Sequence, residues 1–227
     1  MISIISANWN SYDFAKVLIE TVQMFTKNIY EIIIVDNSLQ KEELAYPNVV
    51  VLPQTTNIGH GAALNLGSKE AQYEYVMFVD IDGHFIKRDW DEYFLDLIEN
   101  FDIIAGRGVP EKPIRPACMF LKRNFAVQYD WRDTPGYKGH RITPDGYDVA
   151  IQAYHQIIKD GLRLKLIESK PSKYQTLNGE DWCIDQVPLF YHHWHGSHLS
   201  ERQVDFPDRS LQEDKNHLFS QLYWRYI

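Results

Sequence analysis

Residues 76–83, VMFVDIDG, combine a run of apolar residues typical of a β-strand with two closely spaced carboxylates. The four apolar residues predict a buried β-strand, and Asp80 and Asp82 follow it two positions apart. Because side chains alternate across a strand, this spacing directs both carboxylates to one side. Carboxylate oxygens suit Mg²⁺ or Mn²⁺, which proteins usually hold with one or two carboxylates and substrate phosphates. The stretch therefore predicts a metal site, with two solvated aspartates at an exposed turn as the alternative interpretation.

Strand-like and helix-like segments alternate on the N-terminal side of this stretch. Apolar runs at residues 2–7, 31–35 and 49–52 predict strands, and helical periodicity at 14–25 and 62–71 predicts two connecting helices. The second run is apolar on both faces, as in a central parallel strand. This alternation predicts an α/β fold with a Rossmann-like, mostly parallel sheet flanked by helices.

Segments with polar residues follow each predicted strand of this half. They occupy positions 7–10, 36–38, 57–61 and 80–82. In open α/β sheets ligands bind beyond the carboxyl ends of the strands, so we expect one crevice to collect all four segments. The glycines of the third segment precede a predicted helix whose N–H groups could approach a phosphate, although such glycines also form plain turns.

The second half of the chain predicts further elements. Strands are expected at residues 102–106, 117–121 and 164–167, and helices at 89–98, 143–161 and 218–224. Asp89 and Glu92 have the spacing of a capping box at the start of the first of these helices. Thr143 as the N-cap of the second would place Asp148 in its first turn, where the helix dipole favours an ionised carboxylate. Residues 130–146 are expected to form a long loop, either an acceptor-binding lid or a surface excursion.

Histidines are concentrated in one short segment. Four of the nine lie within residues 192–198, directly after an apolar run. In an extended chain His193 and His195 share one face, opposite His192. This density is hard to explain by core packing and therefore indicates a functional role.

Composition narrows the class of protein. The 227 residues are 44% hydrophobic, enough for one sizeable domain, and the net charge of −8 leaves no basic surface for nucleic acid. No apolar run approaches the ~20 residues of a membrane span. The chain leads from Met1 straight into a strand without a signal peptide, so we expect a cytoplasmic protein with Cys118 and Cys183 as free thiols.

The order of these pieces resembles the family 2 glycosyltransferases of the GT-A fold, including rhamnosyltransferase-like members. The matching blocks are NWNS at 8–11, IVDNS at 34–38, NIG at 57–59 with Asn65 and Gly67 after it, and VDID at 79–82. The likeness extends over roughly the first 200 residues. It implies a single GT-A domain over residues 1–227, whose nucleotide-binding part is the N-terminal one (about 1–100) and whose acceptor-binding and metal-completing part is the remainder (about 101–227).

The resemblance also implies a function: inverting, metal-dependent transfer of a sugar from a UDP- or dTDP-linked donor to a hydroxyl of a glycan or glycoconjugate. It assigns nucleotide binding to Ala7, Asn8, Asp36, Asn57, Gly59, Asp80 and Ile81. It assigns the metal to Asp82 with His193 or His195, and an imidazole ligand favours Mn²⁺ over Mg²⁺.

The catalytic base is expected at one of two positions. Family members typically carry Glu-Asp at the start of a helix that a glycine, a strand and the metal histidine follow. Residues 147–167 have that layout with Tyr in place of Glu, which favours Asp148. Glu180 and Asp181 have the expected letters without the expected helix, which leaves Asp181 as the second candidate.

Two other classes of protein share parts of this pattern. A sugar nucleotidyltransferase would need a glycine-rich basic loop near the first strand, and residues 6–11 contain neither Gly nor Lys. A non-catalytic nucleotide- or metal-binding module would keep Asp80 and Asp82 but would need no base. An acidic chain of this size is also compatible with one catalytic unit of a larger multi-domain glycosyltransferase.

Overall fold

Ten strands and five helices occur in residues 1–109, 112–132, 149–172 and 179–193, which the computed structural model describes. In chain order they are β1 (Ile2–Asn8), α1 (Tyr12–Phe25), β2 (Tyr30–Asp36), β3 (Val49–Pro53), α2 (His60–Glu70), β4 (Tyr75–Val79), β5 (Gly83–Phe85), α3 (Trp90–Ile98), β6 (Ile103–Val109), β7 (Lys112–Lys122), α4 (Arg123–Gln128), α5 (Ile151–Lys159), β8 (Leu164–Pro171), β9 (Gly179–Ile184) and β10 (Val187–His193). Within this described part, no helix has the length and apolarity that crossing a membrane requires.

The strands form one sheet in the order β3-β2-β1-β4-β7-β6-β8-β9-β10-β5. The first four are parallel, as the sequence predicts. From β4 onward the sheet is mixed, because β7 is antiparallel to both β4 and β6, and β8, β9, β10 and β5 pair antiparallel in turn. The predicted α/β architecture is therefore confirmed, with the parallel arrangement concentrated in the N-terminal half.

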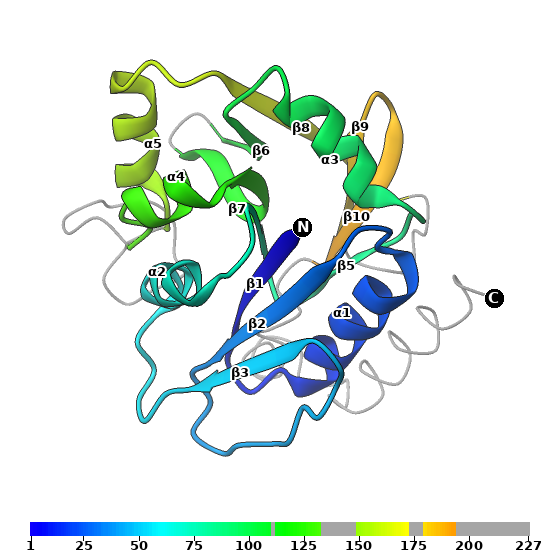
Figure 1. Cartoon of the computed structure of the whole chain (residues 1–227), viewed down its shortest axis with the longest axis vertical. Helices are drawn as coiled ribbons and strands as arrows, with labels where there is room; N and C mark the ends of the chain where they lie inside the picture. Colours follow the sequence, from blue (N-terminus) through cyan, green and yellow to red (C-terminus); the bar gives the residue numbers. More distant parts are fainter. Residues whose placement is uncertain (110–111, 133–148, 173–178, 194–227) are drawn as a thin grey trace, which may run out of the picture.

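Helices cover both faces of the parallel strands, which explains why those strands are apolar throughout. In Figure 1, α2, α4 and α5 lie on one side of the sheet and α1 and α3 on the other. Ile4 of β1 packs with the α1 and α3 residues, while its neighbour Ile5 packs with those of α2 and α5. Both are fully buried, and each contributes about 1.5–3 kcal/mol by leaving water.

Helix α3 begins where the sequence predicts, but not through a capping box. Asp89 has a left-handed backbone (φ 57°) and its side chain makes no capping hydrogen bond. The nearby acids instead hold the turn after α1: Asp91 accepts hydrogen bonds from the backbone N–H groups of Lys27 and Asn28, at 3.1 and 2.8 Å. Tertiary contacts thus take the place of the predicted local cap.

Helix α5 begins later than the predicted start at Thr143. Its first residue is Ile151, and the preceding Ala150 has a left-handed backbone (φ 70°) and donates its N–H to the carbonyl of Trp131, at 3.2 Å. The predicted end is confirmed, because Gly161 follows the helix with φ 70°. Thr143, most of the predicted loop 130–146 and the predicted helix 218–224 lie outside the described residues.

Candidate active site

The acidic turn after β4 is joined by strand pairing to the histidine-bearing strand β10. The Gly83 N–H donates to the Asp80 carbonyl at 3.0 Å, which closes the turn, and β5 then runs antiparallel to β10 with Gly83 opposite His192. A Cβ at Gly83 would collide with the ring of Phe190, so only glycine fits there. Backbone pairing therefore brings residues about 110 positions apart in the chain into one place.

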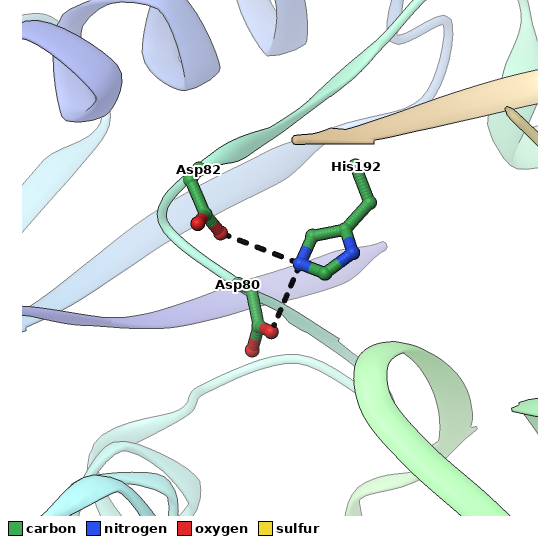
Figure 2. A group of neighbouring side chains, drawn as sticks. All are labelled: Asp80, Asp82 and His192. Carbon is green, nitrogen blue, oxygen red and sulfur yellow. Dashed lines mark ion pairs between the residues drawn. The ribbon is translucent and has the colours of Figure 1, made fainter. Parts of the chain in front are cut away.

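Two carboxylates and one imidazole converge at this point. The Nε2 atom of His192 lies 3.3 Å from Oδ2 of Asp80 and 3.4 Å from Oδ1 of Asp82 (Figure 2). We call these three residues the acid–imidazole cluster. One potential ligand atom from each lies within 4.8 Å of the others. Oxygen and imidazole donors in this number fit Mn²⁺ or Mg²⁺, with the imidazole favouring Mn²⁺.

Solvent reaches this cluster from the Asp80 side. The Asp80 side chain is 26% exposed, whereas that of Asp82 is 5% exposed and that of His192 is 13% exposed. His60, the first residue of α2, reaches the same side, with Nε2 3.5 Å from Oδ1 of Asp80. An ion held by these three residues could take further ligands, such as phosphate oxygens, from the Asp80 side.

The histidine at the cluster is the neighbour of the predicted one. His193 and His195 are the predicted metal ligands, and His195 lies outside the described residues. The His193 ring lies on the other face of β10, with its centroid 5.8 Å from that of Phe14. The structure thus brings His192, rather than His193, to the two acids. Sequence reasoning missed it because alternation along a strand does not tell which face meets the acidic turn.

A buried acid and an arginine lie behind His192. The Nδ1 atom of His192 is 3.6 Å from Oε1 of Glu180, and Arg115 donates to the same oxygen at 2.9 Å. Burial alone would lower the pKa of His192, but Asp80, Asp82 and Glu180 hold it well above its usual value. Burial would likewise raise the pKa of Glu180, and its interactions with His192 and Ser169 together with the charge of Arg115 outweigh that effect and lower it.

A second carboxylate site lies at the end of β2. Asp36 is 1% exposed, and Asn8 and the Ser38 N–H donate to its Oδ1 at 3.0 and 3.1 Å. The Tyr12 hydroxyl donates to Oδ2 at 2.7 Å, and the Lys41 ammonium lies 3.4 Å from that oxygen. We call these five residues the Asp36 cluster. Burial would raise the pKa of Asp36, but the hydrogen bonds with Ser38 and Tyr12 and the charge of Lys41 lower it.

The other predicted nucleotide contacts flank these two clusters. Asn57 accepts a hydrogen bond from the Gly59 N–H at 2.8 Å, and Gly59 has φ 83°, which suits glycine. The loop therefore has a defined turn just before α2. Ala7 is partly exposed next to Asn8, whereas Ile81 is 4% exposed and its side chain belongs to the core.

Of the two candidate catalytic bases, only Asp181 lies among the residues that the structure describes. Asp181 lies in β9 opposite Tyr191, next to Glu180, which is opposite His192. Because neighbouring side chains alternate, Asp181 lies on the other face of β9 from the acid–imidazole cluster. Asp148 lies outside the described residues.

Comparison with known proteins gives a family match over the N-terminal half. Residues 3–114 match the model described as Glycosyl transferase family 2. The poly(ribitol-phosphate) beta-glucosyltransferase of Bacillus spizizenii (strain ATCC 23059 / NRRL B-14472 / W23) is 33% identical over 132 residues, which is 48% of this chain and 20% of that protein. The chain thus spans about a fifth of the length of this curated relative.

Solved structures resemble the fold at low sequence identity. The S. aureus TarS fragment 1–349 has a TM-score of 0.56 at 15% identity, covering 94% of this chain and 68% of that one. The same fragment in complex with UDP-GlcNAc has a TM-score of 0.52 at 15% identity, covering 77% and 60%. The mannosyltransferase PcManGT from Pyrobaculum calidifontis, in complex with GDP-Man and Mn²⁺, has a TM-score of 0.53 at 13% identity, covering 76% and 57%. These likenesses confirm the predicted fold class.

Proposed function

Because this chain belongs to glycosyl transferase family 2 through residues 3–114, we propose that it transfers a sugar from a nucleoside diphosphate sugar to a hydroxyl of a glycan or glycoconjugate. The observation that carries this proposal is the acid–imidazole cluster at the carboxyl end of β4, where its three ligand atoms lie within 4.8 Å of one another. Ligands are found at such places in open α/β sheets. The UDP-GlcNAc complex of TarS and the GDP-Man and Mn²⁺ complex of PcManGT support a nucleotide sugar and a divalent ion as the ligands.

Asp80, Asp82 and His192 would hold the divalent ion, for which we propose Mn²⁺. Bound there, the ion would act as a Lewis acid that stabilises the charge developing on the diphosphate as the sugar leaves. Asp82 and His192 are nearly buried and held by the pairing of β5 with β10, so their donor atoms are preorganised. Asp80 is the more exposed acid and would lie on the donor side.

The Asp36 cluster would shape the nucleotide site. It ties the loop after β1 to the loop after β2 through the hydrogen bonds from Asn8 and Tyr12 to Asp36. Both loops lie at the same end of the sheet as Asp80, beyond the carboxyl ends of the strands, because β2, β1 and β4 are parallel neighbours. Asn57 and Gly59 would border the same site from the loop before α2. We propose a UDP- or dTDP-linked donor.

A carboxylate must also remove the proton of the acceptor hydroxyl as that oxygen attacks the sugar. We propose Asp148 for this role, with Asp181 disfavoured because it faces away from the acid–imidazole cluster. One base and one displacement would invert the configuration of the anomeric carbon. Alignment of donor and acceptor would contribute to the rate as much as the charges do.

A donor screen tests the proposal. The melting temperature of the protein is measured with a panel of nucleotide sugars, with and without Mn²⁺, because a ligand that binds only the folded state stabilises it by about 2.7 kcal/mol at 100 times its Kd. We expect one donor to raise the melting temperature only when Mn²⁺ is present. That donor is then incubated with acceptors that include a poly(ribitol phosphate), the polymer in the name of the B. spizizenii relative.

The product of that incubation decides between the alternatives. Proton NMR of the anomeric position should show inverted configuration in a sugar–acceptor product. A separate incubation of the protein with a sugar phosphate and a nucleoside triphosphate, if it released pyrophosphate, would instead identify a nucleotidyltransferase. Metal-dependent donor binding without turnover on any acceptor would favour a non-catalytic module, and no donor binding at all would contradict the proposal.

A further inference from the structure

Glu180 faces the nitrogen of His192 that points away from the two aspartates. In the antiparallel pairing of β9 and β10, Glu180 is directly opposite His192, so both side chains lie on one face. The distance from Nδ1 of His192 to Oε1 of Glu180 is 3.6 Å, while Nε2 faces Asp80 and Asp82. The two ring nitrogens therefore have separate environments. A histidine that binds a metal through one nitrogen usually donates the other N–H to a carboxylate, which sets its tautomer and orientation.

Glu180 is itself held in place by contacts with a neighbouring arginine. Its side chain is only 8% exposed, and a carboxylate that is so deeply buried needs a partner. Arg115 supplies one, since its guanidinium donates to Oε1 of Glu180 at 2.9 Å. The guanidinium carbon also lies 5.9 Å from the centre of the Trp182 ring, within range of a cation–π interaction.

The packing of Trp182 keeps this arginine in position. A Cβ at Gly106, in β6, would lie 2.7 Å from two carbons of the Trp182 ring, so the missing side chain makes room for the indole. Trp182 is fully buried, and Arg115 contacts both its ring and Glu180. Side chains from β7 and β9 thus form a continuous set of contacts that ends on the Nδ1 side of His192.

We propose that Glu180 is a positioning residue that accepts the Nδ1 proton of His192 and so presents Nε2 to the metal ion, and that Arg115 holds Glu180 in this position. The inference rests on the metal site of the proposed function. It gives the Glu180-Asp181 pair a role different from that of a catalytic base: the first acid supports a metal ligand, while Asp181 faces the other way.

Direct measurement of Mn²⁺ binding tests this role without relying on activity. Free Mn²⁺ is titrated by electron paramagnetic resonance in the full chain and in Glu180→Ala and Glu180→Gln. Removing the carboxylate in Glu180→Ala should raise the Mn²⁺ Kd about 10- to 100-fold, the range typical for groups that orient metal ligands. Glu180→Gln keeps an acceptor oxygen but no charge, and should raise the Kd by less than about 10-fold.

A matched control is available on the neighbouring strands. Arg107 and Glu168 form another Arg–Glu pair between β6 and β8, but the Glu168 side chain is 59% exposed. Glu168→Gln removes one negative charge as Glu180→Gln does, and should leave the Mn²⁺ Kd unchanged. A second readout is the NMR spectrum of the His192 ring with Mg²⁺ bound, in which the Nδ1–H proton should resonate far downfield in the wild type, because Glu180 accepts it, and should lose that downfield shift in Glu180→Ala.

The outcomes separate this inference from the proposed function. Equal Mn²⁺ affinity in the wild type and Glu180→Ala would overturn the positioning role alone, and equal losses in Glu180→Ala and Glu180→Gln would do so too, because they would reflect charge rather than geometry. Should Glu180→Ala fail to fold, unchanged affinity and an unchanged Nδ1–H resonance in the isosteric Glu180→Gln would overturn it instead. Failure of the wild type to bind Mn²⁺ would overturn the metal site and this inference together.

Discussion

The Asp36 cluster and the carboxylates around His192 lie at the same end of the parallel strands and differ in how their negative charge is balanced. In the Asp36 cluster, one carboxylate receives hydrogen bonds from two side chains and a backbone N–H and lies near an ammonium group. Around His192, three carboxylates surround one imidazole, and Arg115 contacts one of them. The first group is balanced by the protein itself, so it should serve mainly the fold. The second gathers negative charge that a divalent ion would offset, so it should serve mainly function.

The largest expected effect is that of Asp82→Asn. Loss of this nearly buried ligand should abolish Mn²⁺ binding and lower transfer by about 10³-fold or more, or about 4 kcal/mol in the activation barrier. The melting temperature without metal should change little, because the substitution removes repulsion between the acids but also removes the ion pair of Asp82 with His192. Calorimetric Mn²⁺ titration, transfer assays and thermal melting provide the measurements.

Asp96→Asn is the control for this variant, since Asp96 is exposed on α3 and belongs to neither cluster. It should change none of the three quantities. Normal Mn²⁺ affinity in Asp82→Asn would contradict the difference between the two clusters, because the negative charge around His192 would then not serve metal binding.

Asp148→Asn should lower transfer by about 10²- to 10⁴-fold, the usual contribution of a general base. Mn²⁺ and donor binding should remain, which would separate the base from the metal site. Asp181→Asn serves as the paired variant, and its transfer rate per folded molecule should remain close to that of the wild type. The reverse result, with transfer lost only in Asp181→Asn, would exchange the two assignments.

Asp36→Asn should mainly affect stability. It takes an ionised acceptor away from Asn8, Tyr12 and Lys41, and hydrogen bonds to charged groups contribute about 1.5–3 kcal/mol each in net terms. We expect a loss of that order in the free energy of unfolding, measured by urea denaturation, with Mn²⁺ affinity unchanged. Tyr12→Phe removes one donor and should cost less. If Asp36→Asn weakened Mn²⁺ binding as strongly as Asp82→Asn, the two clusters would not be separate.

The smallest expected effect is a dependence of Mn²⁺ affinity on pH. The raised pKa of His192 means that the metal-free protein carries an imidazolium there at neutral pH, which an ion must displace. Affinity should therefore rise with pH until that pKa is passed, by about tenfold or 1.4 kcal/mol per pH unit for one proton. Mn²⁺ titrations at several pH values measure the slope.

The same pKa shift has the opposite effect on the metal-free fold. Stability from the His192 ion pairs is fully present below the pKa of an unfolded histidine, about 6.5, and is lost as pH rises through the folded pKa.

The control for the pH dependence of Mn²⁺ affinity is Asp36→Asn, which should show the same pH slope of Mn²⁺ affinity as the wild type. A flat profile in the wild type would show that His192 does not exchange a proton for the ion.

Local patterns predicted those parts of this protein that neighbouring residues control. Apolar runs and helical periodicity placed β1, β2, β4 and α1 correctly, because burial on both faces of a sheet leaves a mark on each strand. The prediction of a capping box at Asp89 was wrong, because Asp91 and Glu92 accept hydrogen bonds from Lys27 and Asn28 in a turn far away in the sequence. A local sequence pattern does not show such a contact. The late start of α5 has a similar cause, since the Ala150 N–H bonds to Trp131.

The sequence by itself determined the α/β alternation, the family and the position of Asp80 and Asp82 at the end of a strand, because these depend on residues adjacent in the chain. Only the tertiary structure decided which histidine faces them. Side chains on a strand alternate, so a shift of one residue in the pairing of β10 with β5 would exchange His192 for His193. The register of β10 with β5 is set by contacts between segments far apart in sequence. The pairing of β9 with β10 then places Glu180 behind the histidine and turns Asp181 away.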